Sequence, residues 1–166
     1  MNQEVVMLMR FREKMKSHEY FMNEAIKEAK KAFLKNEVPV GAVVVYQDKV
    51  IARAHNLRES KQAFHAHAEF LAMQKAAKKI GSWRLEECIV YVTLEPCSMC
   101  AGAMIQSRVK ALYYGATDPK AGAVESVVKL LDNAFNHQIA CQGGLLKETT
   151  SDLLKKFFKK LRDEEK

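Results

Sequence analysis

A buried strand that leads directly into two closely spaced cysteines is the feature that most constrains the fold of this chain. The segment Cys88-Ile-Val-Tyr-Val-Thr-Leu94 is apolar and rich in β-branched residues, which is typical of a core strand. Glu95-Pro96 ends the strand, and because Pro is well tolerated at the first position of a helix, a helix is expected to begin there. Cys97 and Cys100 then lie on one face of the first helical turn. The start of a helix favours the thiolate, which is the form of cysteine that binds metal.

A second group of candidate ligands precedes this strand, in the sequence His67-Ala-Glu69. These two side chains would diverge on an ideal helix, so we expect His67 to lie before the next helix or at its N-terminal cap. Catalytic zinc has three protein ligands and an open position, whereas structural zinc has four protein ligands. We therefore predict that zinc binds to His67, Cys97 and Cys100. The complete H-x-E…P-C-x-x-C pattern is the signature of zinc nucleobase deaminases, and it assigns the acid–base role to Glu69.

Two other interpretations of these residues remain open. A C-x-x-C pair alone is often a structural metal site or a redox site. In addition, His65 and His67 would point to the same side of an extended segment, so with Cys97 and Cys100 they would form a closed site of four ligands. Such a site would be structural and would leave Glu69 without a role. Zinc retention after substitution of His65 distinguishes the two arrangements.

Composition indicates one intracellular domain and argues against several classes of protein. The chain has 166 residues, of which 48% are hydrophobic, and it contains only 7 Gly and 3 Pro, so it buries a core. No apolar run approaches the length that spans a membrane, and residues 5–9 are too short for a signal-peptide core. The 4 cysteines do not form a disulfide framework when two of them bind metal. We expect a cytoplasmic protein in which Cys88 and Cys141 are buried.

The charge and the C-terminal segment suggest an anionic partner. The formal net charge is +7, which favours a polyanion. Phe157-Phe158 stands between pairs of lysines, ahead of Arg162, and apolar residues recur at helical spacing from Leu153 to Leu161. A helix docked on the core explains this pattern, and so does a surface for single-stranded RNA, because bases stack on aromatic side chains. The two interpretations are compatible if one Phe packs inward and the other faces the site.

Hydrophobic periodicity along the rest of the chain predicts alternating strands and helices. Ser17 can cap a helix that extends to about Asn36. The hairpin is expected at Val38–Tyr46 and Lys49–His55, with its turn near Gln47-Asp48. Further elements are expected as a helix at Phe70–Lys79, a strand at Ala111–Ala116, a helix near Ser126–Asn133, a strand at Gln138–Cys141 and a final helix. Because strands after the hairpin alternate with helices, a layered α/β sheet follows.

Longer blocks of sequence accompany the metal motifs: Val38-Pro-Val-Gly-Ala42, Gly81-Ser-Trp-Arg-Leu85, Tyr91-Val-Thr-Leu-Glu-Pro-Cys97, Met99-Cys-Ala-Gly-Ala-Met104, Tyr114-Gly-Ala116, Asp118-Pro-Lys120 and Asn136-His137. Through these blocks the chain resembles the bacterial tRNA adenosine deaminases from about Tyr20 to Phe158. The resemblance implies a three-layer, cytidine-deaminase-like α/β fold with a central mixed sheet of about five strands. It also implies a homodimer with one zinc ion per subunit. Residues 17–166 would be a single zinc-dependent deaminase domain, and residues 1–16 an N-terminal extension that is partly disordered.

At matched positions the resemblance implies contacts with the anticodon loop of tRNA. Asn56 would hydrogen-bond the flipped base, and Asp118 and Lys120 would lie in the loop that shapes the anticodon. The residues that would line the RNA groove are Phe157, Phe158 and Arg162. Each position also has an ordinary structural explanation. Asn56 could simply form a turn, Asp118 and Lys120 could form an ion pair in a loop, and the C-terminal residues could belong to a helix packed on the core.

The predicted reaction is hydrolytic deamination of adenosine to inosine at the wobble position of tRNA. Glu69 would take a proton from water and pass it to N1 of adenine as hydroxide attacks C6, and would then protonate the departing amine. Two other functions remain open. One is deamination of a free base or nucleoside, such as guanine or cytosine, and the other is a non-catalytic RNA-binding module stabilised by zinc.

Two residues depart from the pattern of the family. His65 stands where a small polar residue is common, so it can tune the site or add a contact. Glu125 lies in a stretch that is usually small and neutral, and it adds a negative charge near the expected path of the RNA.

Overall fold

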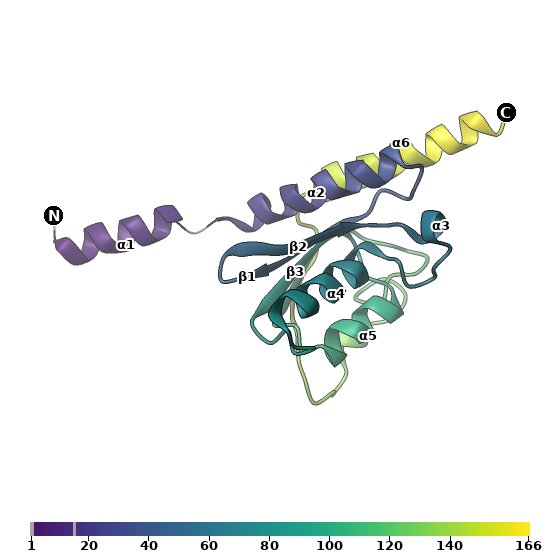
Figure 1. Cartoon of the computed structure of the whole chain (residues 1–166). Coiled ribbons are helices and arrows are strands. Elements are labelled where there is room, and N and C mark those ends of the chain that lie inside the picture. The colour runs from purple at the N-terminus through teal and green to yellow at the C-terminus, as the bar shows by residue number, and fades with distance from the viewer. Residues whose placement is uncertain (1, 15) are drawn as a thin grey trace.

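The chain folds into a five-stranded mixed sheet between two layers of helices (Figure 1). The computed structural model describes residues 2–14 and 16–166. The sheet has the order β2-β1-β3-β4-β5 and consists of β1 (Gly41–Tyr46), β2 (Lys49–His55), β3 (Cys88–Leu94), β4 (Ala111–Ala116) and β5 (Ala140–Gln142). Strand β1 is antiparallel to β2 and β3, whereas β3, β4 and β5 are parallel. The predicted α/β class with a mixed five-stranded sheet is confirmed.

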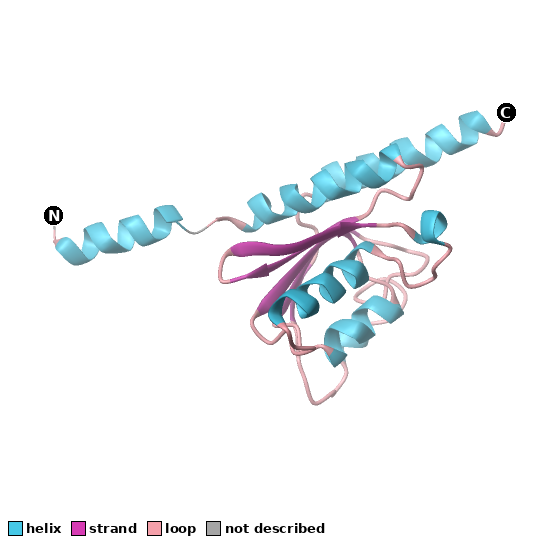
Figure 2. Ribbon diagram, viewed as in Figure 1, coloured by secondary structure: helices cyan, strands magenta, loops and turns pink. Residues whose placement is uncertain are grey.

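The helices divide between the two faces of the sheet (Figure 2). Helices α2 (His18–Leu34) and α6 (Lys147–Glu164) cover one face, and α4 (Ala68–Ile80) and α5 (Ser98–Gln106) cover the other. The remaining helices are α1 (Gln3–Lys14), α3 (Arg58–Lys61) and the short 3-10 helix η1 (Leu130–Asp132). In the described part of the chain, no helix is both long and apolar enough to cross a membrane.

The predicted N-terminal extension contains helix α1, which lies apart from the sheet in Figure 1. Met1 and Met15 of this extension lie outside the described residues. Where the extension meets the domain, the backbone N–H of Lys16 donates a hydrogen bond of 3.2 Å to Oδ2 of Asp48 in the hairpin turn. The boundary between extension and domain remains a prediction.

Neighbouring strand residues face opposite layers of helices, as the pleat of a strand requires. Val43 and Val45 of β1 belong to the apolar cluster under α2, together with Tyr91 of β3. Val44 of β1 and Val90 of β3 belong to the larger cluster under α4 and α5. The central strands are therefore buried on both faces, which explains why β3 has a nearly continuous apolar sequence.

Local signals predicted the first half of the fold well. Ser17 caps α2, and its Oγ accepts a hydrogen bond of 3.1 Å from the N–H of Tyr20. The β1–β2 turn lies at Gln47 and Asp48, both of which have positive φ, the conformation that a tight hairpin turn requires.

Three expectations for the second half differ from the structure. The helix predicted near Ser126–Asn133 is wrong, because only η1 forms there and the backbone N–H of Leu130 bonds to the carbonyl of Ala123 (3.0 Å) in place of the carbonyl of Ser126 that a helix requires. The strand predicted at Gln138–Cys141 begins two residues later and ends one residue later, as β5. Cys88 is buried, as expected, but Cys141 is exposed because β5 is an edge strand.

Candidate active site

The end of β3 places Cys97 at the N-cap of α5, where its backbone is extended (φ −75°, ψ 174°). Pro96 therefore precedes the helix, and the prediction that it occupies the first helical position is wrong. The reason is a pairing with a distant loop, in which Cys97 forms an antiparallel bridge with Gly122 and the carbonyl of Pro96 accepts a hydrogen bond of 2.8 Å from the N–H of Ala123. Cys100 lies in the first turn of α5, as predicted, and it is buried.

His67 is the N-cap of α4, as its spacing from Glu69 predicted, with extended backbone angles (φ −82°, ψ 149°). Its Nδ1 lies 3.5 Å from the Sγ atoms of both Cys97 and Cys100. The three candidate ligand atoms all lie within 4.8 Å of one another, a spacing that a single metal ion can bridge.

His65 does not join this group of ligand atoms. Its ring packs edge-on against two aromatic rings, with centroid distances of 5.5 Å to Phe64 and 5.8 Å to Phe70. The geometry therefore favours three protein ligands over the closed arrangement of four.

Electrostatics around the cysteines fit a bound cation. A hydrogen bond from Cys100 is the main reason that the pKa of Cys97 falls to about 4, and His67 lowers it further. The same hydrogen bond to Cys97, together with burial, raises the pKa of Cys100. The hydrogen bond with Cys97 also raises the pKa of His67. Two sulfurs and an imidazole that share protons in this way offer the donor set of catalytic zinc, because a divalent cation replaces the shared protons.

Glu69 lies in the first turn of α4, beside this group of ligands, and is 4% exposed. Burial raises the pKa of its carboxyl group. Its Oε2 atom is buried and has no hydrogen-bond partner among the residues that the structure describes. An unpaired buried carboxylate oxygen is costly and is characteristic of a functional site. This oxygen is therefore the strongest single indication of a functional site in the described residues.

A cavity of about 170 Å³ brings the candidate residues together. His67, Glu69 and Cys97 line it, and so do Asn56 and Asp118, which were predicted to contact the substrate. Asn56 is 7% exposed, and it is fixed by a hydrogen bond of 3.3 Å from its Nδ2 to the carbonyl of Val38 and one of 3.1 Å to its Oδ1 from the N–H of Arg58.

Comparison with known proteins identifies the family. The profile of the MafB19-like deaminases matches residues 16–162. A tRNA-specific adenosine deaminase of Bacillus subtilis is 51% identical over 153 residues, which cover 92% of this chain and 95% of the relative. The chain belongs to the tRNA-specific adenosine deaminase family. Another such deaminase, from Aquifex aeolicus, is 45% identical over 146 residues, which cover 87% of this chain and 96% of the relative.

Solved structures agree with this assignment to the deaminases. One is a tRNA:A34 deaminase that was studied for A-to-I editing at the wobble position. It superimposes on this chain with a TM-score of 0.78 and is 41% identical, and the match covers 81% of this chain and 98% of that chain. A guanine deaminase from Nitrosomonas europaea has a TM-score of 0.77, with coverage of 86% and 85%, but at 23% identity the similarity concerns the fold alone. The predicted cytidine-deaminase-like fold is confirmed.

The remaining predicted residues of the deaminase lie outside the cavity. Lys120 is exposed in the loop after β4, and Arg162 is exposed near the end of α6. Both phenylalanines belong to α6: Phe157 is 2% exposed and packs against Phe33 of α2, whereas Phe158 is 43% exposed. The carboxylate of Glu125 accepts a hydrogen bond from the hydroxyl of Tyr114, so part of its charge is engaged within the protein.

Sequence reasoning missed two buried carboxylates beside the cavity. Glu95, which the sequence identified only as the end of a strand, is 2% exposed and accepts hydrogen bonds from a loop more than twenty residues later. Glu37 is 1% exposed and accepts hydrogen bonds from the N–H of Glu59 (3.2 Å) and from the hydroxyl of Ser60 (2.6 Å), which anchors α3. No local signal indicates either role, because the partners are distant in sequence.

Proposed function

We propose that this deaminase converts adenosine to inosine at the wobble position of tRNA, anticodon position 34. The unpaired Oε2 of Glu69 beside three metal-binding side chains carries the chemical part of the proposal. The names of the relatives that are 51% and 45% identical support the substrate. The tRNA:A34 deaminase structure, at 41% identity, supports the position of the edited base.

We infer that the resident cofactor is one zinc ion per subunit, held by His67, Cys97 and Cys100. One neutral imidazole and two thiolates leave the fourth position open, as in catalytic zinc sites. When bound, zinc would supply the Lewis acidity that makes water nucleophilic at neutral pH.

The role of Glu69 is to move protons between water and the base. Burial raises the pKa of its carboxyl group, which favours proton uptake by this carboxylate. The free Oε2 can accept the proton of the attacking water and deliver it to N1 of adenine. It can then take the proton of the new hydroxyl group on C6 and give it to the departing amine, which leaves as ammonia and forms the C6 carbonyl of inosine.

Asn56 is well placed to bind the base in the cavity. Its amide has two N–H donors, of which one is used by the carbonyl of Val38. The second donor remains for an acceptor on the edge of the purine, while the hydrogen bond from Arg58 fixes the orientation of the amide. Asp118 lies on the wall of the same cavity and would contact a flanking part of the RNA.

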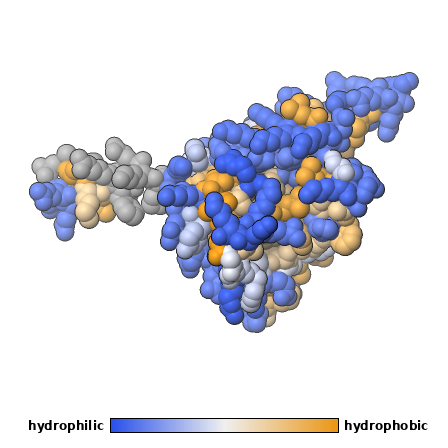
Figure 3. Space-filling model, viewed as in Figure 1, coloured by the Kyte–Doolittle hydropathy of each residue, from blue (hydrophilic) through white to orange (hydrophobic). Residues whose placement is uncertain are grey.

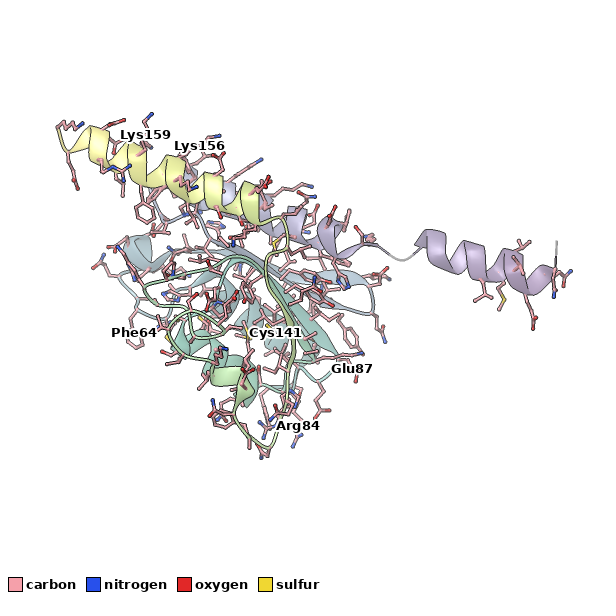
Figure 4. The ribbon with its side chains drawn as sticks, turned by 180° about the vertical axis from the view of Figure 1, so that it is seen from behind. Phe64, Arg84, Glu87, Cys141, Lys156 and Lys159 are labelled. Atoms are coloured by element: carbon pink, nitrogen blue, oxygen red, sulfur yellow. The ribbon has the colours of Figure 1, made fainter. Side chains whose placement is uncertain are left out.

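The basic side of α6 would bind the RNA outside the cavity. Lys156 and Lys159 project from α6 away from the sheet, as seen from behind in Figure 4. Figure 3 shows the hydrophilic cover over this helix, interrupted by apolar side chains. Exposed Phe158 offers a stacking surface, and Arg162 offers a phosphate contact. Lys120 would add a further contact from the loop after β4.

We also propose that the deaminase acts as a homodimer in the cytoplasm, where its tRNA substrate is found. Large apolar side chains are exposed at Ile80, Trp83 and Val127, with exposed fractions of 40%, 56% and 56%. An interface between subunits buries contiguous apolar surface, and we propose these side chains as parts of it. Sedimentation of the purified protein measures the assembly directly.

The experiment that tests the proposed function is inosine formation on an anticodon stem-loop with adenosine at the wobble position. Zinc-loaded protein is incubated with the stem-loop and, separately, with free adenosine, guanine and cytosine. Conversion of the stem-loop alone supports the proposal, whereas turnover of a free base in its place contradicts the RNA substrate. The Glu69→Ala variant is the matched control, because it should retain zinc and lose turnover.

A further inference from the structure

One buried carboxylate organises the loop on the far wall of the cavity. Oε1 of Glu95 accepts a hydrogen bond of 3.0 Å from the N–H of Asp118. Its Oε2 accepts three more, from the N–H groups of Val124 (3.1 Å), Glu125 (2.9 Å) and Ser126 (3.0 Å). The hydroxyl of Ser126 donates a fifth hydrogen bond, of 2.5 Å, to Oε1. Glu95 itself is 2% exposed, so these donors bond to the protein in place of water.

The loop of residues 118–126 contains no helix or strand. Besides the hydrogen bonds to Glu95, it has the bridge between Gly122 and Cys97, turns within the loop, and hydrogen bonds from Ala123 to Pro96, from Leu130 to Ala123 and from Tyr114 to the side chain of Glu125. Because buried N–H groups must be paired, the carboxylate takes the place that a neighbouring strand or a helix would otherwise fill.

Gly122 lets the loop approach this carboxylate closely. A Cβ atom at this position would lie 2.3 Å from Oε2 of Glu95 and 2.4 Å from its Oε1, so any side chain would displace the carboxylate or the loop. Glycine is therefore required at residue 122 by contact, independently of its backbone angles.

The hydrogen bonds of Glu95 fix residues that face the substrate cavity. Asp118 lines the cavity, and its Oδ1 accepts hydrogen bonds from the N–H groups of Lys120 (3.1 Å) and Ala121 (3.2 Å). Glu95 thus determines the position of Asp118, and Asp118 determines the turn that carries Lys120. Glu69 and His67 are positioned separately, by helix α4.

We propose that Glu95 is a positioning residue for substrate binding, which holds the loop 118–126 in the conformation that receives the RNA around the flipped base. This inference rests on the proposed function, because the loop contacts RNA only if RNA is the substrate. Glu95 borders the cavity, but both of its carboxylate oxygens are engaged by N–H and O–H groups of the loop rather than free for the base. Its loss should therefore weaken binding of the stem-loop more than it slows the chemical step, which depends on α4 and α5.

The Glu95→Gln variant tests this with little change in shape. The amide oxygen of Gln can keep the three hydrogen bonds from the N–H groups of residues 124–126. The hydroxyl of Ser126 can turn so that its oxygen accepts a hydrogen bond from the NH₂ group of Gln. The NH₂ group of Gln then faces the N–H of Asp118, and two donors cannot bond to each other. We expect KM for the stem-loop to rise by about tenfold, with kcat within about twofold of the wild type and zinc content unchanged.

The Gly122→Ala variant disturbs the contact between the loop and the carboxylate from the loop side, without a substitution at Glu95. It should also raise KM for the stem-loop by about tenfold, because the new methyl group displaces the carboxylate. In a Glu95→Ala background the clash is gone, so adding Gly122→Ala should raise KM no further. Independent, additive effects of the two substitutions would overturn the inference.

A matched buried glutamate separates positioning from general destabilisation. Glu28 is 3% exposed and bonds to Lys31 and His55 on the α2 side of the sheet, away from the cavity. Glu28→Gln should lower the melting temperature and leave KM unchanged.

The inference is overturned if Glu95→Gln has the KM of the wild type, or if it loses kcat and zinc while KM stays constant. Absence of stem-loop turnover by the wild-type protein is a different result. It overturns the proposed function, and the RNA role of the loop with it.

Discussion

Phe157 and Phe158 are adjacent in α6 and lie in opposite environments, with exposed fractions of 2% and 43%. The ring of Phe157 packs edge-on against Phe33 of α2, with 5.7 Å between ring centroids, and so joins the two helices that cover one face of the sheet. Phe158 stays at the surface, in a helix with exposed lysines. One helix can therefore support the core and also present an aromatic side chain to RNA.

Alanine substitutions at these two positions should separate stability from RNA binding. Phe157→Ala should lower the free energy of unfolding by about 3–5 kcal/mol, because it leaves a cavity between α2 and α6. Phe158→Ala should change stability by less than about 0.5 kcal/mol and weaken stem-loop binding by about 1–3 kcal/mol through lost stacking. Thermal unfolding and fluorescence anisotropy with a labelled stem-loop measure the two effects. Equal RNA affinity of Phe158→Ala and the wild type would contradict the surface role.

Zinc retention should distinguish His65 from His67. The ring of His65 packs against Phe64 and Phe70, whereas Nδ1 of His67 lies 3.5 Å from both cysteine sulfurs. His65→Ala should keep one zinc per subunit, and His67→Ala should lose most of it, because a site with only three protein ligands would depend on each of them. Atomic absorption after dialysis gives the metal content. Loss of zinc from His65→Ala would revive the closed site of four ligands.

Removal of the carboxylate of Glu69 should stop the reaction without releasing the metal. General acid–base catalysis contributes about 10²–10⁴-fold to a rate, and Glu69→Gln keeps the size of the side chain but cannot accept the proton. The single-turnover rate on the stem-loop should fall by at least about 10²-fold, with zinc content and stem-loop affinity near those of the wild type. A Gln variant that retains most of the wild-type rate would show that another group moves the proton.

The sequence predicted those parts of the fold and the site that depend on neighbours along the chain. The apolar run of β3, the cap at Ser17 and the position of His67 before α4 follow from local spacing and propensity, and all three agree with the structure. The metal group was also predictable, because helix starts after strand ends bring their residues to one edge of an α/β sheet.

Contacts between distant segments could not be predicted in this way. The helix expected near Ser126–Asn133 does not form, because the N–H of Leu130 bonds to the carbonyl of Ala123. Ala123 lies in the loop that is held by Glu95, whose position some 30 residues earlier gives no local signal. Pro96 precedes α5 for a related reason, since its carbonyl accepts a hydrogen bond from Ala123. Cys141 has an apolar neighbourhood in sequence, but only the strand order reveals that β5 is at the edge of the sheet.

Stability should depend on pH through the two ion pairs of Glu24, one within α2 and one from α2 to β2. Oε1 of Glu24 lies 2.6 Å from Nζ of Lys27 and Oε2 lies 2.9 Å from Nη1 of Arg53, and these two hydrogen bonds lower the pKa of Glu24 below 4.5. A carboxylate whose pKa is lower in the folded state stabilises the protein above its unfolded pKa, and this stabilisation is lost as the pH falls through the folded pKa. Glu24→Gln should therefore melt about 2–4 °C lower than the wild type at pH 7, which corresponds to about 1 kcal/mol.

The difference between the melting temperatures of Glu24→Gln and the wild type should shrink steadily as the pH is lowered below 4.5. Glu86→Gln is the matched control, because Glu86 pairs with Arg84 at 3.0 Å but both side chains are 56% exposed. Solvent screens such a pair, so its loss should change the melting temperature little at either pH. Calorimetric scans at a series of pH values measure all three proteins. A constant difference for Glu24→Gln across the series would mean that packing of the side chain, rather than its charge, stabilises the contact between α2 and β2.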